Sequence, residues 1–476
     1  MTEQNPPSTA VPRHPSARYN SHLPALVADF VVLGGGLAGL TFADEATRRG
    51  RSAIVLERDE QVGGLSRTMT YGDYRFDLGG HRFYTAMTHI NAWVDDLLGD
   101  DMIEVGRRSR IRLQKRYVDY PIEFPGAISA FPVPTAARII GSYIGATIAR
   151  ISPKPDISFE DWVTQRFGRA LYDIYFKPYT EKVWGMDCTQ LSADWASQRI
   201  KLPSLMAAVT GSLKRAGKPT AATLVSRFTY PVLGIGMMTD RLAERATATG
   251  RAFVQVNSAV ERLEHEEAAG LWRVHYRHAG EERIAEGRQV ISTIPLDRMI
   301  PMLPAAPAET LAASRRLDYR SLMCVFLAVD GQRVSEDTWT YFPDRGLTLG
   351  RTHEPRNWSP RMAPEGSTSL CVEVFCQAQD RVWQTDDAAL ITTVTDELDK
   401  LGFLARTRVH NAWMTRVHDA YPVYRIGYKE VLDQLYDHLR RFPTLHLVGR
   451  TGSFSYLNID AVIDQALKTA SELAKQ

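Results

Sequence analysis

The sequence begins with glycines whose spacing suits a dinucleotide. Gly34, Gly36 and Gly39 stand in the order GxGxxG. This spacing permits a tight turn, a close approach of the backbone to a pyrophosphate, and close packing of a helix on a strand, with the phosphate at the helix N-terminus. Glu57 follows about 20 residues later, where a carboxylate can accept hydrogen bonds from ribose hydroxyls. Together these residues predict a dinucleotide site.

A second glycine-rich stretch, at 63–68, suits the middle of a long dinucleotide. It contains Gly64, Ser66 and Arg67. The glycine makes the turn flexible, and the guanidinium can give forked, charge-assisted hydrogen bonds to a pyrophosphate or reach the ribityl region. A cofactor that is held along its whole length requires such a second contact.

A third glycine-rich stretch, at 77–81, indicates that the cofactor is FAD rather than NAD. Gly79 and Gly80 leave the backbone bare, so that it can approach a flat ring, and His81 follows directly. Three such turns in the first 81 residues fit a buried flavin. We expect His81 to lie beside the isoalloxazine ring; the alternative is a hydrogen-bonded structural histidine.

The pattern of apolar residues predicts the elements that position these turns. An apolar run at 30–33, the first glycine turn, a helical pattern to Arg49 and an apolar run at 53–56 indicate strand, turn, helix and strand. The chain ends on a similar theme, with a strand at 445–448 and a helix at 461–473. Further strands are expected at 252–256, 259–263, 272–277, 289–293, 323–329 and 369–375, and helices within 159–214.

Because the dinucleotide-binding parts lie at both ends of the chain, the two domains must be interleaved. The predicted fold is α/β, a Rossmann-like FAD-binding domain interleaved with a mixed α+β substrate domain. The FAD-binding domain takes residues 25–105, 225–297 and 405–476, and the substrate domain takes 106–224 and 298–404. Residues 1–24 combine prolines with polar residues and lack the apolar run of a signal peptide, so we expect a disordered lead.

The charge balance and the cysteines narrow the class of protein. Lysine plus arginine number 57 and aspartate plus glutamate 55, so no overall field favours nucleic acid as a partner. The four cysteines include no CxxC pair, which suits packing thiols in a reduced compartment rather than disulfides or structural zinc. We expect a cytoplasmic enzyme with no metal site and a small-molecule substrate; the oligomeric state stays open.

The longest apolar stretch, 136–151, is too short and too polar to cross a membrane. It carries Arg138, Ser142 and Arg150, and a span needs about 20 apolar residues. We expect a core helix with one buried face; a helix that rests on a membrane surface is the alternative.

Taken together, the motifs resemble the FAD-dependent superfamily that includes amine oxidases, protoporphyrinogen oxidase, carotene desaturases and UDP-galactopyranose mutase. The resemblance covers nearly the whole chain after residue 27. The stretch 231–236, together with the expected strand 259–263 downstream, resembles the family's second FAD-contacting segment. In that segment the backbone near Val260 meets the adenine. Five stretches resemble the mutase more than the oxidases: GxHxFxT at 79–85, YTxKxWG at 179–185, YFP at 341–343 with Arg351 after it, YPV at 421–423 and GRxGxxxYL at 449–457.

This resemblance implies roles for individual side chains. A nucleotide sugar presents two phosphates, which arginines can bind through forked hydrogen bonds while phenols add neutral donors. The residues implied for the diphosphate are Arg351, Arg450, Tyr421 and Tyr456. Trp184 would lie beside the substrate, with a core tryptophan as the alternative, and His81 and Asn458 would lie near the flavin.

The resemblance implies a mutase-like reaction: N5 of reduced FAD attacks the anomeric carbon of a nucleotide sugar and the nucleoside diphosphate leaves. The sugar ring then opens and recloses as a furanose, and the flavin returns unchanged. An external donor such as NAD(P)H would keep the flavin reduced. The alternative is an FAD-dependent oxidoreductase similar to the amine or protoporphyrinogen oxidases. Two departures from the mutase pattern keep it open: Arg82 replaces an apolar residue, and 203–231 does not match the mutase mobile loop.

A third hypothesis is a protein that binds no flavin. Relatives that escort prenylated small GTPases use the same fold without the cofactor. The intact GxGxxG turn, Glu57 and Arg67 argue against this alternative.

Overall fold

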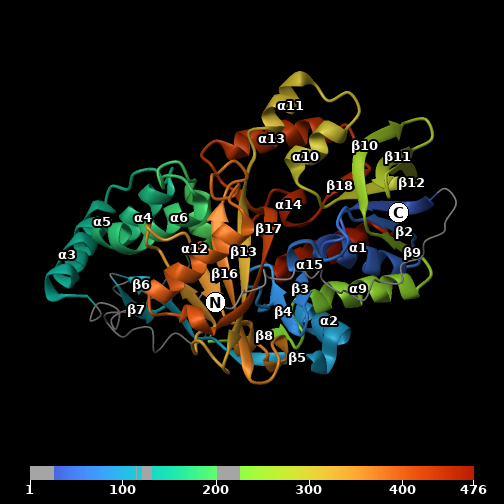
Figure 1. The fold of residues 1–476 in the computed structure, drawn as a ribbon. Coiled ribbons are helices and arrows are strands. Elements are labelled where there is room, and N and C mark those ends of the chain that lie inside the picture. The colour runs from blue at the N-terminus through green and yellow to red at the C-terminus, as the bar shows by residue number, and fades with distance from the viewer. Residues whose placement is uncertain (1–25, 114, 121–130, 201–225, 476) are drawn as a thin grey trace.

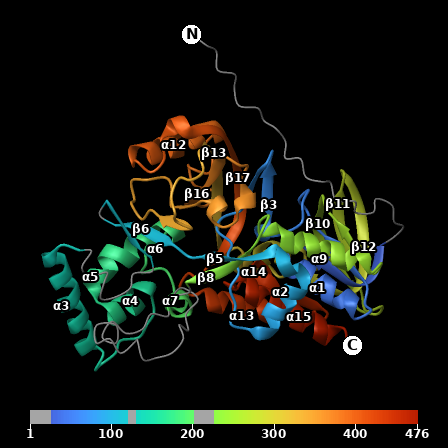
Figure 2. The same cartoon turned by 90° about the horizontal axis from the view of Figure 1, so that it is seen from below.

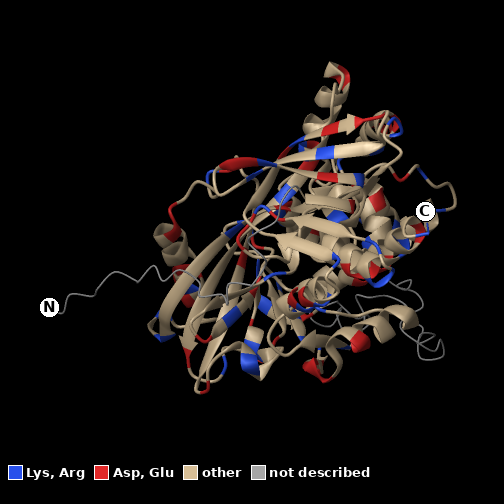
Figure 3. Ribbon diagram, turned by 90° about the vertical axis from the view of Figure 1, so that its right-hand side faces the viewer, with Lys and Arg blue, Asp and Glu red and all other residues tan. Residues whose placement is uncertain are grey.

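A computed structural model describes residues 26–113, 115–120, 131–200 and 226–475. The lead expected at 1–24 and most of the unmatched stretch 203–231 lie outside these residues. Two seven-stranded sheets and a lobe of helices make up most of the described chain (Figure 1). Acidic and basic residues are interspersed along the ribbon, as the near-neutral composition requires (Figure 3).

The first sheet contains the predicted strand, turn, helix and strand. These are β1 (Leu26–Leu33), α1 (Leu37–Arg48) and β2 (Ala53–Leu56), and β1 pairs in parallel with β2. The strand order is β10-β11-β12-β1-β2-β9, and β18 pairs in parallel with β12. The other strands are β9 (Ala252–Gln255), β10 (Ser258–Glu266), β11 (Leu271–His278), β12 (Glu281–Ser292) and β18 (Leu445–Leu447). All of them overlap the predicted strands.

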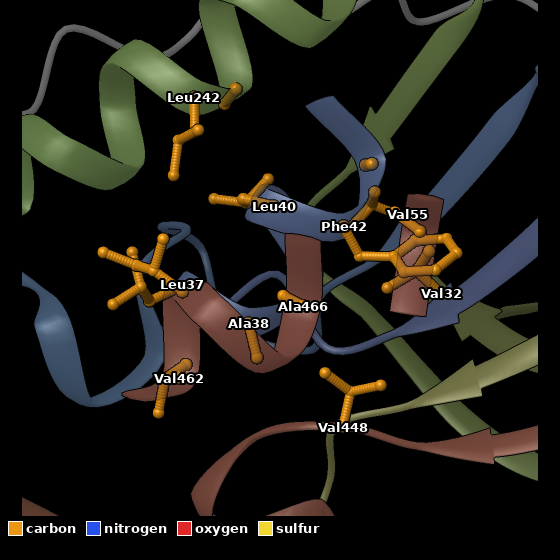
Figure 4. Close-up of a cluster of buried hydrophobic side chains, with 14 of the residues drawn as sticks. Val32, Leu37, Ala38, Leu40, Phe42, Val55, Leu242, Val448, Val462 and Ala466 are labelled. Atoms are coloured by element: carbon orange, nitrogen blue, oxygen red, sulfur yellow. The ribbon is translucent and has the colours of Figure 1, made fainter. Parts of the chain in front are cut away.

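The side chains of β1 alternate between two buried faces, as expected for a strand in the interior of an α/β sheet. Phe30 and Val32 pack with α1 and with two later helices, α9 (Gly236–Ala248) and α15 (Ile459–Leu473). Figure 4 shows this core, in which Val32 and Val55 lie near Phe42. Val31 and Leu33 join the core on the other face.

Helices from distant parts of the chain cover that other face. They are α10 (Leu296–Met299), α11 (Ala308–Ser314) and α13 (Tyr428–Leu439). The first sheet is therefore a buried layer between two groups of helices.

The second sheet has the order β17-β13-β16-β15-β14-β6-β7. Its strands are β6 (Ser109–Leu113), β7 (Arg116–Asp119), β13 (Asp318–Asp330), β14 (Trp339–Tyr341), β15 (Arg351–His353), β16 (Ser367–Cys376) and β17 (Val409–Val423). β17 comes from the stretch 405–476, which sequence analysis assigned to the FAD-binding domain. It lies here because it pairs with β13 along almost its whole length.

Both faces of the second sheet are also covered. Met323, Val325 and Leu327 of β13 pack on α12 (Asp387–Lys400). The alternate residues face a hairpin of β3 (Thr68–Tyr71) and β4 (Tyr74–Asp77). All four cysteines are buried and none forms a disulfide, which agrees with packing thiols.

A lobe of short helices lies beside the second sheet. It contains α4 (Phe159–Phe167), α5 (Arg169–Leu171), a short π-helix (Tyr172–Phe176), α6 (Lys177–Trp184) and α7 (Ala193–Arg199). α4 begins with a capping box in which Ser158 accepts from the backbone of Asp161 and the Asp161 carboxylate accepts in return. Gly185 ends α6 in the left-handed conformation.

The prediction that the apolar stretch 136–151 forms a core helix with one buried face is confirmed only in part. The helix is present as α3 (Val133–Ala149), but only Ile139 and Tyr143 of it are buried. α3 packs through this one narrow side on α4 and α5. The pattern of apolar residues predicted a helix, but it could not predict how little of the lobe would cover it.

A buried carboxylate joins the hairpin to the second FAD-contacting segment. The two oxygens of Asp77, at the end of β4, accept from the Thr68 hydroxyl (2.7 Å), the Tyr230 hydroxyl (2.6 Å) and the backbone N–H of Ile235 (3.1 Å). Tyr230 belongs to β8 (Arg227–Pro231), which pairs with β5 (Met102–Gly106). β5 follows α2 (Thr88–Leu98) in the chain. These bonds hold together two segments more than 150 residues apart.

Replacing Asp77 should test this junction. Asp77→Ala leaves buried donors unpaired and is expected to lower the free energy of unfolding by about 2–3 kcal/mol, because each orphaned donor loses its partner. Melting temperatures of the flavin-containing protein measure the effect. Asp73→Asn, at an exposed neighbouring site, is the control and should change little.

Asp77 should also make stability depend on pH. Burial raises its pKa to about 7. The folded protein therefore holds a proton that the unfolded chain has lost, and this stabilising contribution decreases as the pH rises from about 4 through about 7. Asp77→Asn is expected to gain stability relative to the wild type over that range. An unchanged difference between the two melting curves from about pH 5 to pH 8 would contradict this assignment.

Candidate functional site

The first two glycine-rich turns line a cavity of about 660 Å³ at the carboxyl ends of β1 and β2. Ligands of α/β sheets bind at this edge, and the volume lies in the usual range of about 300–1,000 Å³. The predicted cofactor residues on its walls are Gly34, Gly36, Glu57, Gly64, Ser66, Arg67, His81, Val260 and Arg450. Residues from three separate stretches thus meet in one cavity.

The three glycines of the first turn have different reasons to be glycine. A Cβ at Gly34 would lie 2.5 Å from the Thr293 hydroxyl, and one at Gly39 would lie 2.1 Å from the Gly34 carbonyl oxygen. A Cβ at Gly36 would meet no protein atom closer than 3.8 Å. Gly34 and Gly39 are therefore required by the fold, whereas the space at Gly36 suits a phosphate that approaches the backbone.

Glu57 is buried with both carboxylate oxygens engaged. One accepts from the Gly35 N–H at 2.8 Å and the other from the Asp59 N–H at 3.0 Å. Burial raises the pKa of Glu57. The carboxylate thus braces the glycine turn, and its remaining lone pairs can accept from ribose hydroxyls.

Arg67 lies on the cavity wall but already has protein partners. It forms an ion pair with Asp59 at 2.8 Å and donates to the Gly64 carbonyl at 3.0 Å. These bonds orient the guanidinium beside the second turn. Thr415 to Asp419 of β17 also line the cavity. Sequence analysis did not identify them, because only the pairing of β17 with β13 brings them there.

A second cavity, of about 380 Å³, adjoins the first. It brings together predicted residues that are far apart in the chain, and both cavities share His81 and Arg450. The predicted residues on its walls are Gly80, His81, Arg351, Tyr421, Arg450, Tyr456 and Asn458. A reactant in this cavity would therefore meet the cofactor at His81 and Arg450.

Two arginines and two tyrosines form a stacked cluster on its wall. The rings of Tyr421 and Tyr456 are parallel with centroids 5.7 Å apart, and the Arg450 guanidinium lies 5.0 Å from the Tyr456 ring. Arg199 approaches the same ring at 3.9 Å and donates to the Asn458 side chain at 3.0 Å. Arg450 itself donates to the Leu457 carbonyl at 2.6 Å. The guanidinium groups of Arg199 and Arg450 thus donate to neutral oxygens, so their positive charges can still attract an anion.

Arg351 has a different environment, because a buried carboxylate holds it. Its Nε donates to Glu373 at 2.7 Å, and its Nη2 donates to the other oxygen of the same carboxylate. The charge of Arg351 lowers the pKa of Glu373 to about 2 despite burial, with His353 contributing from 3.6 Å. This forked pair fixes the plane of the guanidinium and leaves Nη1 for a ligand.

His81 is neutral at ordinary pH. Its half-buried ring lies between the two cavities, and desolvation together with the nearby charge of Arg450 lowers its pKa to about 4. Nδ1 lies 3.1 Å from the Gly79 carbonyl, so it carries the hydrogen and Nε2 carries a lone pair. His81 can therefore accept a hydrogen bond at the junction.

Three predicted residues lie outside both cavities. Trp184 is buried behind the tyrosine cluster, with ring centroids 6.3 Å from Tyr421 and 6.1 Å from Tyr456. Gly39 packs α1 on its strand, and Gly79 lies beside Glu373. From these positions, these residues can act only by supporting the groups that line the cavities.

Several residues of the second cavity were not singled out from sequence as site residues. They are Arg82, Tyr84, Arg107, Tyr120, Gln198, Arg199, Trp339, Tyr341, Ile459 and Asp460. Arg82 had been noted only as a departure from the mutase pattern, although its place directly after His81 was a usable signal. Tyr84 lies in the stretch 79–85 and Tyr341 in the stretch 341–343. The remaining residues belong to no motif, since β14 and the end of α7 meet only in the folded protein.

Gly36 and Gly39 offer a matched test of the cofactor cavity. Gly36→Ala should fold normally but lose FAD affinity by about tenfold or more, because the methyl group would enter the phosphate space. Gly39→Ala should lower the melting temperature itself, because its Cβ would clash with the turn. Flavin content after purification and melting curves separate the two effects. Gly106→Ala, where a Cβ meets no atom within 4 Å, is the control; normal FAD binding by Gly36→Ala would contradict the assignment.

Comparison with known proteins agrees with this geometry. The family model of flavin containing amine oxidoreductases matches residues 37–474. Coproporphyrinogen III oxidase of Propionibacterium freudenreichii is 25% identical, and the match covers 92% of this chain and 91% of that protein. A Klebsiella pneumoniae protein assigned as UDP-galactopyranose mutase is 24% identical over 173 residues, 35% of this chain and 43% of that protein. An inactive retinol reductase of Danio rerio matches at 37% identity over only 13% of its own length.

Solved structures share the fold. A reduced UDP-galactopyranose mutase superposes with a TM-score of 0.80 at 21% identity, over 94% of this chain and 96% of that one. An Exiguobacterium protein assigned as a protoporphyrinogen oxidase follows with a TM-score of 0.74 at 18% identity, over 96% and 100%. Putrescine oxidase with bound putrescine gives 0.65 at 16% identity, over 95% and 100%.

The glycine turn at the end of β1, the space at Gly36, the braced Glu57 and the extent of the family match lead to one conclusion. This chain belongs to the family of flavin-containing amine oxidoreductases and is an FAD-dependent enzyme.

Proposed function

We propose that this enzyme acts on a nucleotide sugar and interconverts its pyranose and furanose forms with reduced FAD, as a UDP-galactopyranose mutase does. The observation that carries the proposal is the second cavity, which adjoins the cofactor cavity at His81 and Arg450. The described residues of its lining include the arginines Arg82, Arg107, Arg199, Arg351 and Arg450. Such a wall suits a substrate with phosphate groups.

The cluster of Arg199, Arg450, Tyr421 and Tyr456 can hold a diphosphate as it leaves the sugar. Two guanidinium groups held by neutral partners can stabilise the charge that develops on the leaving oxygen. Desolvation raises the pKa of Tyr421, so its phenol keeps its hydrogen and can donate. When bound, reduced FAD supplies the nucleophile for the anomeric carbon, and the protein supplies orientation and charge.

His81 has a limited part in this scheme. Because it is neutral and its Nδ1 hydrogen is engaged by Gly79, it cannot supply a positive charge. Its Nε2 can accept a hydrogen bond from the sugar or the flavin at the junction of the two cavities. Arg351, fixed by Glu373, would direct Nη1 to the diphosphate.

The second candidate function is net oxidation of an anionic substrate by FAD. It is favoured by the full-length match to a coproporphyrinogen oxidase, and arginines bind carboxylates as well as phosphates. An amine is a poorer candidate, because a protonated amine would be repelled by the cationic wall. An electron acceptor would then replace the external reductant, such as NAD(P)H, that a mutase needs.

The mutase proposal predicts a specific reaction. Protein reduced with dithionite or NADPH should bind UDP-galactose and convert part of it to the furanose form, whereas oxidised protein should not turn it over. Chromatography of the sugar nucleotides measures the conversion. Absence of both binding and isomer in the reduced protein would overturn the proposal, and bleaching of the oxidised flavin by coproporphyrinogen would establish the second candidate instead.

Arg199 provides a sharper test of the diphosphate site. Arg199→Gln should weaken binding of UDP-galactose by about 10–100-fold, because charge-assisted hydrogen bonds contribute about 1.5–3 kcal/mol. Fluorescence titration of the reduced protein measures the dissociation constant. Arg440→Gln is the control, because Arg440 is an exposed arginine at the C-terminal end of α13 that pairs with Asp437. Equal affinity of the Arg199 variant and the wild type would remove Arg199 from the site.

A further inference from the structure

The outer face of α3 carries a stripe of exposed apolar side chains. Val133 is 83% exposed, Ile140 43%, Ile144 48% and Ile148 61%. The stripe continues past the end of the helix to Ile151, which is 86% exposed. Steps of three, four and seven residues place these side chains on one side of a helix. Scattered exposed apolar residues are ordinary, but a continuous stripe marks a surface that another body covers.

The fold does not need this stripe. α3 is held by a neighbouring side, where Ile139 and Tyr143 are buried and the Ser142 hydroxyl accepts from the Ala170 N–H at 3.1 Å. The close approach of Gly168 to the Ser142 backbone brings α5 against the same side. Two faces of one helix are therefore apolar, and only one of them packs on the protein.

The place of α3 in the molecule leaves the stripe accessible. In both Figure 1 and Figure 2, α3 lies at the outer edge of the helical lobe, at the end away from the first sheet. It is a projecting helix and does not line either cavity. Of the residues that the structure describes, none thus stands between this edge of the lobe and a flat surface that approaches it.

The charges around the stripe are basic. α3 contains no aspartate or glutamate, Arg138 lies within it, and Arg150 and Lys154 follow it. The nearest acidic residue along the chain, Asp156, forms an ion pair with Arg166 at 2.8 Å. Among the described residues, the ion-pair partner of Arg138 is Asp173, at 4.0 Å, and 67% of the Arg138 side chain is exposed. The surroundings of the stripe therefore complement a negatively charged surface.

The size of the stripe argues against a second copy of the chain. A helix of 17 residues is about 26 Å long and about 10 Å wide, which is roughly 260 Å² of contact. A stable dimer needs about 800 Å² from each partner. A single projecting helix with an apolar stripe and basic flanks instead suits the boundary of a lipid bilayer, where such helices lie in the plane of the interface.

We propose that α3 binds the enzyme to the surface of a membrane that contains anionic lipids. The apolar side chains of the stripe enter the boundary between headgroups and acyl chains, while Arg138, Arg150 and Lys154 contact the headgroups. This contact is peripheral: among the described residues, no helix is long and apolar enough to span a bilayer. It does not depend on which substrate occupies the second cavity.

Vesicle co-sedimentation with the flavin-containing protein tests the proposal. Wild-type protein should sediment with phosphatidylcholine vesicles that contain about 30% phosphatidylglycerol, more weakly with pure phosphatidylcholine, and less at high salt. Ile144→Glu with Ile148→Glu should lower the bound fraction about tenfold or more, because two carboxylates would have to enter the apolar boundary. The flavin spectrum shows whether each variant is folded.

A matched control separates this contact from general adhesion of apolar residues. Ile284→Glu with Ile426→Glu changes two exposed isoleucines that lie off α3. They are 42% and 43% exposed, against 48% and 61% for Ile144 and Ile148. This double variant should sediment as the wild type does. Wild-type protein that stays in the supernatant, or equal loss in both double variants, would overturn the proposal. So would light scattering that shows a wild-type dimer lost in the α3 variant, because the stripe would then cover a second copy.

Discussion

The parallel pairing of β1 with β2 on one side and β12 on the other is the constraint on which the structure depends. It places the carboxyl ends of three strands at one edge, and the chain reaches that edge again after β18. Gly34, Glu57 and Arg450 therefore meet although they are far apart in sequence. Without this pairing, the glycine turn would be an isolated loop, since a dinucleotide site needs the helix N-terminus and the neighbouring strand end together.

The second sheet completes the cavity at that edge and forms a second cavity beside it. β17 contributes one wall of the cofactor cavity, and β14 and β15, which lie in the interior of the second sheet, contribute part of the wall of the second cavity. The two cavities meet where burial keeps His81 neutral and where the guanidinium of Arg450 donates to the Leu457 carbonyl. His81 as a neutral acceptor and Arg450 as a cation lie side by side at this junction. Together they can orient a polar reactant against a flavin, and no buried carboxylate is needed at the junction.

Ion pairs divide the arginines of the second cavity into different roles. Glu373 balances most of the charge of Arg351 and fixes its orientation. Arg199 and Arg450 are held by neutral oxygens and keep more of their charge for a ligand. This difference, rather than the number of arginines, determines where an anion binds in the cavity. The anion will lie closer to the guanidinium groups that no carboxylate compensates.

Local signals in the sequence determined the strand, turn, helix and strand around Gly34, most later strands, and the cofactor, because hydrophobic period and glycine spacing act within about 30 residues of chain. Only the tertiary structure decided the rest. Sheet pairing placed β17 beside β13. Trp184 had been expected beside the substrate, but packing buries it behind Tyr421 and Tyr456. The register of β15 and β16 places Glu373 opposite Arg351. The exposure of α3 likewise depends on how much of the lobe reaches it. An apolar pattern shows which side chains burial would favour, but only the neighbours that pack on them determine whether they are buried.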